Sequence, residues 1–510
     1  MKLYKWQEVC LQNWKENQYR GIVNVITGAG KTVAALAAMD LLLRRFPDLR
    51  IRIVVPTIPL ASQWNQALLK HAKTADDFPG FYGGGKKDPT DRKVMIYIIN
   101  SARSSLSRHI QRDFSLNRPV LLICDECHHY QSKENRRIFD FLKTDASMLS
   151  LYHCIGLSAT PFGTQDDAFL TSVLGKEIFS YGFQQAAAEK LISGFYICQI
   201  SVSFLAGEYR EYLQLTDLVR AALARLLKAW PHLKNLEKKD FMRAVTVIAR
   251  KADMDPAEPA VQFLLTTFQR KAVSTMSHAR LLCCLSLIRK LPSNRRILIF
   301  CEQMKQAENL YRLIGRTFGP IAGLYHSGIT TDARTRILSQ FREGSLRILC
   351  ACRCLDEGID VPDADVGIVV SSSSVSRQRI QRLGRIIRRS PGKHAACLYY
   401  IYIRESTDET VYLDNMKDGV VYHLRYDTCE DAFSNELYEY AALNLLDNTQ
   451  KSNAEPSIRK ELRACILEGL IHPDYLMDEP LQEQLMQEAS SIHQKNYWYA
   501  MKRIGESFRE

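Results

Sequence analysis

The sequence lacks several features that would direct it to particular classes of protein. No uninterrupted apolar run reaches the roughly 18 residues that cross a membrane. It has no low-complexity segment and no internal repeat of fixed short period. Residues 1–6 lack the apolar core of a secretory signal. We therefore expect an ordinary soluble protein without a membrane span or a repeat architecture.

A second pair of metal ligands is also missing. The chain has 14 cysteines, and without a secretory signal this number indicates a reducing, cytoplasmic compartment. Cys124 and Cys127 are followed by two histidines, which are ligand types of zinc sites. However, Asp125 and Glu126 stand between the two cysteines, and no other ligand pair is suitably spaced. Zinc is therefore the weaker interpretation.

The length and the charge of the chain limit the number of domains and the class of partner. The 510 residues suit two to four domains, and 46% hydrophobic residues are enough to bury sizeable cores. The net charge is +12 and the isoelectric point is about 9.0. This balance favours a polyanionic partner such as nucleic acid, although a mild basic excess is also common in proteins that bind none.

Strand-length apolar runs alternate with helical stretches in two parts of the chain. They lie at 22–26, 52–55, 95–99, 120–124 and 153–157, and again at 296–301, 347–350, 365–370 and 396–401. Such runs are typical of parallel sheets covered by helices on both faces. Ligands of these sheets bind beyond the carboxyl ends of the strands, so the polar turns there are the expected site.

The same rhythm divides the chain into four regions. We predict an α/β fold with a first domain at 1–202 and a second domain at 292–404. Helical periodicity with many charges predicts a helical linker or insertion at 203–291. Residues 405–510 are polar and predicted to be a mostly helical accessory region.

The stretch 22–32 passes from an apolar run into a glycine-rich turn that ends in lysine and threonine. Gly28 and Gly30 would let backbone N–H groups approach phosphate oxygens. Lys31 would pair with the β and γ phosphates, and the Thr32 hydroxyl would hold Mg²⁺. These features predict a phosphate-binding loop between a strand and a helix.

The strict phosphate-loop pattern requires a glycine where this chain has Val25. The alternative is a plain strand-to-helix turn. The rest of the chain argues against it.

Two adjacent carboxylates follow the apolar run 120–124. Asp125 is suited to hold Mg²⁺ directly or through water, and Glu126 to polarise the water that attacks the γ-phosphate. A solvated loop is the alternative, but a buried strand aimed at two acids makes it the weaker one.

Three motifs, in this order, resemble motifs I, II and III of superfamily 2 helicases: Thr27-Gly28-Ala29-Gly30-Lys31-Thr32, Asp125-Glu126-Cys127-His128 and Ser158-Ala159-Thr160-Pro161. In that family the position of Val25 is commonly not glycine. Cys127 makes the second motif a DECH variant. The resemblance implies two tandem RecA-like domains, ATP and Mg²⁺ as cofactors, nucleotide contacts from Thr27 to Thr32, and a coupling role for Ser158 and Thr160.

Other stretches of the first domain resemble further motifs of the family. Gln7 follows Trp6 where the family places an aromatic-glutamine pair that recognises adenine. Turns at the strand ends would contact the nucleic-acid backbone without reading sequence, through Pro56, Thr57, Ser101 and Arg103. Gly84, in the glycine-lysine stretch 83–87, suits the same task, although a flexible loop explains that stretch equally well.

The second domain carries the remaining resemblance. His326 and Ser327 match a backbone-contacting motif. By resemblance, Gly358 would approach the γ-phosphate and Asp360 the ribose. The family also implies a coupling role for a pair of residues in its last motif, Gln381 and Arg382.

Arg385 and Arg388 lie three residues apart, so on a helix they project from one face. A solvated basic face is the alternative for this pair. We predict that they are arginine fingers supplied across the cleft between the domains.

The motifs cover about residues 1–404 and look closest to the group of nucleotide-excision-repair translocases, RadD-like proteins and restriction-enzyme motors. This resemblance implies an ATP-dependent DNA helicase or translocase, in DNA repair or genome defence. Membership of this group favours DNA as the substrate. No residue excludes RNA, so an RNA helicase is an alternative. Two further alternatives are an ATP-switched nucleic-acid sensor and the motor of a nuclease complex. We find no nuclease constellation, so a nuclease would be a separate protein partner.

Overall fold

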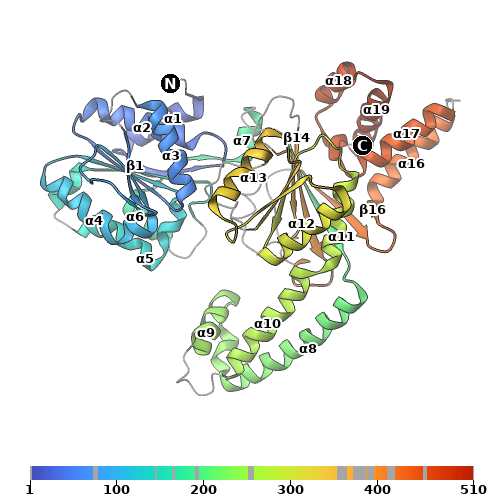
Figure 1. The fold of residues 1–510 in the computed structure, drawn as a ribbon, viewed down its shortest axis with the longest axis horizontal. Helices are drawn as coiled ribbons and strands as arrows, with labels where there is room; N and C mark the ends of the chain where they lie inside the picture. Colours follow the sequence, from blue (N-terminus) through green and yellow to red (C-terminus); the bar gives the residue numbers. More distant parts are fainter. Residues whose placement is uncertain are drawn as a thin grey trace.

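The structure is a computed structural model that describes residues 3–72, 78–143, 146–162, 167–189, 194–250, 258–352, 364–371, 386, 395–409, 420–451 and 456–508. It contains two large sheets, each covered by helices, with a helical arm beside the second sheet and a helical module at the C-terminal end (Figure 1). The predicted α/β class with two tandem RecA-like domains is therefore confirmed.

The first sheet has the strand order β4-β3-β5-β2-β6-β7-β1-β8. All its neighbouring strands are parallel except the β3–β4 pair. The bounds are β1 (Arg20–Val25), β2 (Arg50–Val55), β3 (Gly80–Gly83), β4 (Lys86–Lys87), β5 (Val94–Ile98), β6 (Val120–Asp125), β7 (Tyr152–Ser158) and β8 (Glu177–Tyr181). The five expected strands correspond to β1, β2, β5, β6 and β7, and the outer strands were not predicted.

Helices lie on both faces of this sheet (Figure 1). The α-helices are α1 (Lys5–Glu16), α2 (Lys31–Arg45), α3 (Ile58–His71), α4 (Ile99–Ser115), α5 (Lys133–Arg136), α6 (Asp167–Leu174) and α7 (Phe183–Ala188). Three 3₁₀ segments, η2 (Cys127–Gln131), η3 (Arg137–Lys143) and η4 (Ala146–Leu151), cover the region after β6. Two separate apolar clusters, one on each face, fill the space between helices and sheet.

The second sheet has the order β11-β12-β10-β13-β14-β9-β15-β16, with only the β15–β16 pair antiparallel. Its strands are β9 (Gly194–Val202), β10 (Ile297–Cys301), β11 (Ala322–Tyr325), β12 (Ile348–Cys352), β13 (Val366–Val369), β14 (Ala395–Ile403), β15 (Val420–Asp427) and β16 (Ala432–Ser434). Helices α11 (His278–Lys290), α12 (Met304–Phe318) and α13 (Thr331–Glu343) belong to the same domain.

Sheet membership moves two of the expected domain limits. Strand β9 was placed in the first domain, but it pairs with β14 and β15 of the second sheet. Strands β15 and β16 were placed in the accessory region, but they extend the second sheet. None of these three strands was predicted, and a local sequence pattern would not have indicated their pairing partners.

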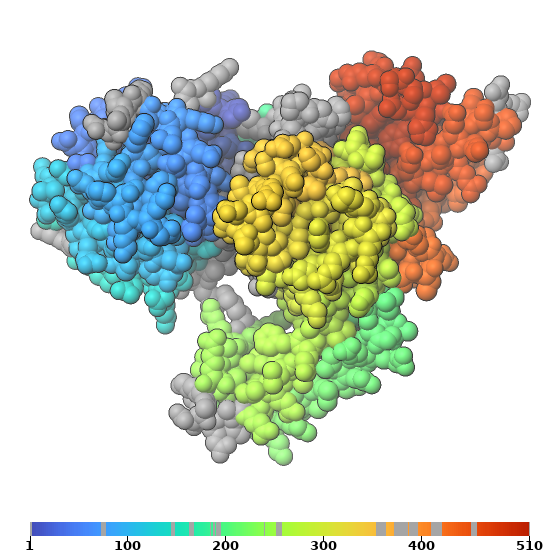
Figure 2. All heavy atoms as spheres, in the orientation of Figure 1, coloured from blue at the N-terminus to red at the C-terminus, as the bar shows by residue number. Residues whose placement is uncertain are grey.

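Between β9 and α11 the chain forms an arm of three helices, which projects from the second domain as a separate lobe (Figures 1 and 2). The arm contains α8 (Ala206–Ala229), η5 (Pro231–Asn235), α9 (Lys238–Arg250) and α10 (Glu258–Met276). It has a small apolar cluster of its own. The helical character expected for 203–291 is present, but α11 packs into the core of the second domain and not into the arm.

The C-terminal module contains α16 (Glu436–Lys451), α17 (Pro456–Gly469), η6 (Pro473–Leu476), α18 (Glu479–Glu488) and α19 (Ile492–Ser507). Two aromatic residues of α19 pack within the protein: Tyr497 donates a hydrogen bond of 2.6 Å to Asp474, and Trp498 packs against the second core. Tyr499 is exposed. None of the helices within the described ranges is long and apolar enough to span a bilayer.

One charged residue is fully buried in the first sheet. Arg52 lies on β2 with no exposed surface, and its guanidinium donates to Asp113 of α4 at 2.7 and 3.1 Å. It also donates to the carbonyl oxygens of Arg92 at 2.9 Å and Thr90 at 3.3 Å. Arg52 therefore ties three segments together at the edge opposite the carboxyl ends of the strands.

Candidate nucleotide and nucleic-acid site

The predicted phosphate loop connects the carboxyl end of β1 to the first residue of α2. Gly28 has φ 92° and Gly30 has φ 97°, in the left-handed region that favours glycine. Gly30 is the N-cap of α2, so the unpaired N–H groups of that helix face the loop. Lys31 donates a hydrogen bond of 2.9 Å to the carbonyl oxygen of Val25. The loop has the backbone form and the cation that a phosphate needs.

The two predicted catalytic acids lie two strands away in the same sheet, because β7 separates β6 from β1. Asp125 is the last residue of β6 and is largely buried. Trp64 of α3 donates its indole N–H to Asp125 Oδ2 at 2.8 Å, and the Glu126 N–H donates to Oδ1 at 2.9 Å. Burial raises the pKa of Asp125, whereas the Trp64 hydrogen bond and the charge of Lys31 lower it. The carboxylate is thus oriented and close enough to Lys31 to interact electrostatically.

Glu126 begins a chain of polar contacts between β6 and β7. Its backbone has φ 47°, an uncommon value for a residue other than glycine. Its Oε2 lies 3.4 Å from His128 Nδ1, which lies 3.0 Å from the Ser158 hydroxyl. Ser158 in turn accepts a hydrogen bond of 3.1 Å from the Thr160 N–H. The predicted coupling residues therefore join the turn after β7 to the acid pair.

Gln7 is placed beside the phosphate loop but is fully buried. Its Nε2 donates to the Gly30 carbonyl oxygen at 3.0 Å, and its Oε1 accepts from the Tyr4 N–H at 2.9 Å. The neighbouring Trp6 is buried and stacked on Phe179 and Tyr181. Both groups of the amide thus contact the protein, and the adenine contact of Gln7 stays a prediction.

Two threonine hydroxyls at the carboxyl edge of the first sheet could make further hydrogen bonds. Thr27 Oγ1 in the loop and Thr160 Oγ1 after β7 are buried and have no hydrogen-bond partner in the described part of the chain. Buried hydroxyls are rarely left unpaired, so they suit a bound polar group such as phosphate or ordered water. Within the same ranges, no cluster of three or more histidine, cysteine or acidic side chains could hold a metal.

The predicted nucleic-acid contacts of the first domain lie on adjoining turns. Thr57 caps α3 and accepts a bond of 3.4 Å from the Leu60 N–H, with Pro56 just before it. The stretch 83–87 forms the β3–β4 hairpin instead of a plain loop. A Cβ placed at Gly84 would lie 3.2 Å from Ile58, and one at Gly83 would lie 2.9 Å from Ser101. The hairpin therefore packs against the starts of α3 and α4.

Arg103 lies one half-turn beyond Ser101 in α4 and is partly buried. Its guanidinium donates to the side-chain oxygen of Asn100. The hairpin lies beside this start of α4, because a Cβ at Gly83 would reach Ser101.

His326 and Ser327 follow β11 in the second domain. His326 is largely buried, and its Nδ1 accepts a bond of 3.1 Å from the Gly328 N–H while its Nε2 lies 3.5 Å from Glu308. Ser327 is exposed and lies 3.8 Å from the sulfur of Met304. The imidazole therefore shapes its own turn. The other predicted residues of this domain lie outside the described residues: Gly358, Asp360, Gln381, Arg382, Arg385 and Arg388.

Three side chains of the site were not assigned from the sequence. Trp64 holds Asp125, and Tyr130 donates to the Val54 carbonyl oxygen at 2.8 Å and contacts that of Asp125 at 3.3 Å. His128 bridges the acid pair to Ser158. Only His128 had a sequence signal, because it belongs to the second motif. Trp64 and Tyr130 belong to none of the motifs, so the sequence does not distinguish them from other aromatic residues of the core.

Comparison with known proteins identifies helicase-type sequences in both domains. Residues 1–163 match the family model described as type III restriction enzyme, res subunit, and residues 278–390 match the helicase conserved C-terminal domain. The chain is 30% identical over 390 residues to DNA 3'-5' translocase XPB2 of Sulfurisphaera tokodaii, which covers 76% of this chain and 79% of the relative. It is 28% identical to the putative DNA 3'-5' helicase Rad25 of Haloarcula marismortui, over 76% of this chain and 51% of the relative.

Two solved structures share the fold. The Hef helicase domain of Pyrococcus furiosus has a TM-score of 0.55 at 18% identity, over 80% of this chain and 97% of that one. The ATP-dependent Type ISP restriction-modification enzyme LlaBIII bound to DNA has a TM-score of 0.51 at 14% identity, over 100% of this chain and 40% of that one. At these identities the likeness shows the fold alone.

Proposed function

The chain belongs to the superfamily 2 helicases and is related to XPB-type DNA translocases and to restriction-enzyme motors, and from this we propose that it hydrolyses ATP to move along DNA. One observation carries the proposal. Lys31, Asp125 and Glu126 converge at the carboxyl edge of one parallel sheet, and the turns proposed to contact DNA adjoin the same edge.

The residues of the first domain divide the work of hydrolysis. Lys31 and the N–H groups of the glycine-rich loop bind and orient the phosphates, because they combine positive charge with donors fixed by the backbone. Glu126 accepts the proton of the attacking water and orients it toward the γ-phosphate. His128 holds the Glu126 carboxylate in place from the Ser158 side.

The Mg²⁺ site is proposed on the donor set. Thr32 and Asp125 supply one hydroxyl and one carboxylate oxygen, and Mg²⁺ usually keeps several waters and takes the remaining ligands from substrate phosphates. When bound, the ion would neutralise charge that develops on the phosphates. Trp64 supports this role because its indole N–H fixes one oxygen of Asp125 and so orients the carboxylate at the carboxyl end of β6.

The second domain would complete the site. We propose that Arg385 and Arg388 stabilise the charge of the transition state from across the cleft, with Gly358 and Asp360 at the nucleotide and Gln381 and Arg382 in coupling. Closure around ATP and reopening after hydrolysis would then shift the two domains along a strand. Contacts with phosphates carry no sequence information, so this movement should be largely independent of sequence and weakened by salt.

The testing experiment measures phosphate release from ATP in four conditions: no nucleic acid, single-stranded DNA, duplex DNA and RNA. Lys31→Ala serves as the blank. We expect DNA to raise the rate well above both the rate without polymer and the rate with RNA. Equal rates in all four conditions would contradict the proposal, and stimulation by RNA alone would favour the RNA helicase.

The residues proposed for hydrolysis fit a second function, an ATP-switched nucleic-acid sensor, equally well. An ATP-switched sensor would also use Lys31 and Glu126, without net movement. Displacement of a triplex-forming strand, or of one strand of a duplex, separates the two, because only a translocase performs it in proportion to ATP consumed. A separate nuclease subunit remains a proposal of the same kind, tested by cleavage of DNA when candidate partners are added.

A further inference from the structure

The arm is anchored to the second domain at the start of α8. Glu208, in the first turn of α8, accepts hydrogen bonds from the Ser277 hydroxyl at 2.7 Å and from the His278 N–H at 2.6 Å. One turn further, the Tyr212 hydroxyl accepts a bond of 3.0 Å from the Thr407 N–H. These contacts join the beginning of the arm to the start of α11 and to the turn after β14.

A second anchor lies at the end of α10. Lys271 Nζ is 3.2 Å from Glu302 Oε1, and Glu302 directly follows β10. Gln306 of α12 is fully buried and donates its Nε2 to the Thr275 carbonyl oxygen at 2.6 Å, while its Oε1 accepts from the Ser371 hydroxyl. The end of the arm therefore contacts residues that follow two strands of the second sheet.

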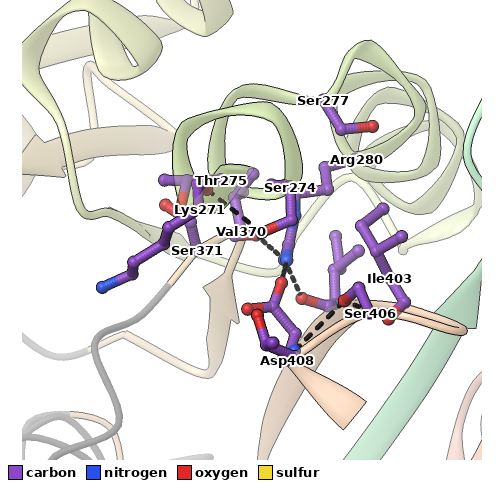
Figure 3. A network of polar contacts seen from close by, with 12 residues as sticks. Lys271, Ser274, Thr275, Ser277, Arg280, Val370, Ser371, Ile403, Ser406 and Asp408 are labelled. Atoms are coloured by element: carbon purple, nitrogen blue, oxygen red, sulfur yellow. Dashed lines mark hydrogen bonds and ion pairs between the residues drawn. The ribbon is translucent and has the colours of Figure 1, made fainter. Parts of the chain in front are cut away.

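Arg280 is the centre of this second anchor (Figure 3). It extends from α11 and is 1% exposed. Its guanidinium donates to the carbonyl oxygens of Ser274 at 2.7 Å and Val370 at 2.6 Å, and also to the Ile401 carbonyl oxygen and the Asp408 carboxylate. One side chain thus fixes the last turn of α10 against the ends of β13 and β14.

These contacts reach the ends of β12 and β13, the two strands that precede the predicted ATP-facing residues in the sequence. The Glu302 N–H donates to the Ser371 hydroxyl at 2.9 Å, and the Cys352 sulfur donates to the Glu302 carbonyl oxygen at 3.3 Å. In the sequence, Gly358 and Asp360 follow Cys352 by 6 and 8 positions, and the predicted arginine fingers Arg385 and Arg388 follow Ser371 by 14 and 17 positions. A shift of α10 would therefore displace the ends of both strands.

We name Lys271, Arg280, Glu302 and Gln306 the arm bridge, and we propose that it makes the orientation of the arm control ATP turnover. Its members are positioning residues that act through the ends of β10, β12 and β13. Buried hydrogen-bond networks of this kind transmit displacement because they leave few alternative arrangements. The inference rests on the proposed function, since it assumes that the second domain completes the ATP site.

Lys271→Ala is the cleanest test because the Lys271 side chain is 45% exposed and its loss leaves no buried gap. Arg220→Ala is the control. It lies on α8 of the arm, and its guanidinium pairs with Asp217 of the same helix, where both side chains are exposed. The double variant Lys271→Glu with Glu302→Lys exchanges the two charges, so it restores an ion pair between the same positions and serves as the rescue. Arg280→Lys tests the buried centre with its charge retained.

Each variant is measured for ATP turnover with and without DNA and for DNA affinity. For Lys271→Ala and Arg280→Lys we expect the ratio of stimulated to basal turnover to fall at least about threefold, within the range of mutations along a coupling path. Basal turnover and DNA affinity should stay within about twofold of wild type. Arg220→Ala should keep the wild-type ratio, and the double variant should regain part of it.

Equal losses of basal and stimulated turnover would mean a merely structural role, and an unchanged ratio in both variants would also overturn the proposal. If wild-type protein shows no stimulation by any polymer, the proposed function fails first. In that case amide hydrogen exchange tests separately whether the arm bridge couples the arm to the nucleotide. A non-hydrolysable ATP analogue should change amide exchange at the end of α10 in wild-type protein, and this change should be lost in Lys271→Ala. No change in wild-type protein would overturn the arm bridge.

Discussion

His128 Nδ1 lies 3.0 Å from the hydroxyl oxygen of Ser158, and this contact joins the turn after β6 to the end of β7. Ser158 is fully buried and also accepts from the Thr160 N–H. The same Nδ1 lies 3.4 Å from Glu126 Oε2. A change in the position of the turn after β7 would therefore move His128 and, through it, the Glu126 carboxylate that we propose orients the water.

Ser158→Ala should slow hydrolysis while ATP binding is retained. Loss of the hydroxyl takes a partner from His128 and from the Thr160 N–H, at a cost of about 1–3 kcal/mol per buried group. We expect kcat to fall about tenfold and the KM for ATP to stay within about twofold. Ser115→Ala, at the exposed end of α4, is the control. A rise in KM with unchanged kcat would contradict this role.

Glu126→Gln should separate binding from chemistry. An amide keeps the shape of the side chain but cannot accept the proton of the attacking water. We expect ATP to bind with nearly wild-type affinity and phosphate release to fall at least about a hundredfold, the lower range of general-base effects. Nucleotide binding by calorimetry and phosphate release on the same sample provide the measurement. Normal turnover would remove Glu126 from the catalytic role.

Gln7→Ala distinguishes two roles of one amide. Because Gln7 is buried and bonds to Tyr4 and Gly30, its loss should loosen the phosphate loop and raise KM for every nucleoside triphosphate alike. If Gln7 instead reads adenine, the variant should lose selectivity between ATP and GTP while the KM for GTP barely changes. Steady-state KM values for both nucleotides decide between these results. Parallel increases for both nucleotides would contradict the predicted adenine contact of Gln7.

The regions that were predictable from sequence are those whose signal is local. Strands such as β6 and β10 are buried on both faces and therefore read as continuous apolar runs. The glycine conformations of the phosphate loop follow from residue type. The β3–β4 hairpin is short, its strand β4 is exposed, and the stretch is rich in glycine and lysine, so it resembled a loop.

Other features depend on contacts between distant residues. The hydrogen bond between Trp64 and Asp125 spans 61 positions of sequence, and nothing in the sequence around Trp64 indicates it. The second-sheet membership of β9 depends on its pairing with β14. Arg280 likewise carries no motif, although it bonds to residues as far as 128 positions away.

His153 should make stability fall in mild acid. It lies on β7 between the rings of Tyr19 and Phe46, and neither ring nitrogen has a hydrogen-bond partner among the residues that the structure describes. Burial, with help from Arg45 and Arg20, lowers the pKa of His153 to about 4. Between this value and the ordinary value of about 6.5 the unfolded chain binds the proton and the folded chain does not. Stability is therefore present above pH 6.5 and is lost as the pH falls toward 4.

His153→Phe keeps the ring packing and removes the titration. We expect the wild-type protein to lose about 2 kcal/mol more than the variant between pH 7 and pH 5. Urea unfolding at both pH values gives the difference, and the other histidines cancel because both proteins share them. Parallel pH dependences would show that His153 is protonated in the folded protein.

Asp113→Ala should destabilise the first domain strongly without touching the ATP site. Arg52 would be left as a buried cation with only carbonyl oxygens as partners, and breaking a buried ion pair in this way costs about 3–5 kcal/mol. Asp140→Ala is the control, because its ion pair with Lys143 is largely exposed and contributes at most about 1 kcal/mol. Replacing both members of the buried pair, Arg52→Met with Asp113→Leu, should recover most of the loss, since no charge then stays unpaired. Urea unfolding monitored by tryptophan fluorescence measures all three. A cost below about 1 kcal/mol for Asp113→Ala would mean that water reaches Arg52 despite its burial.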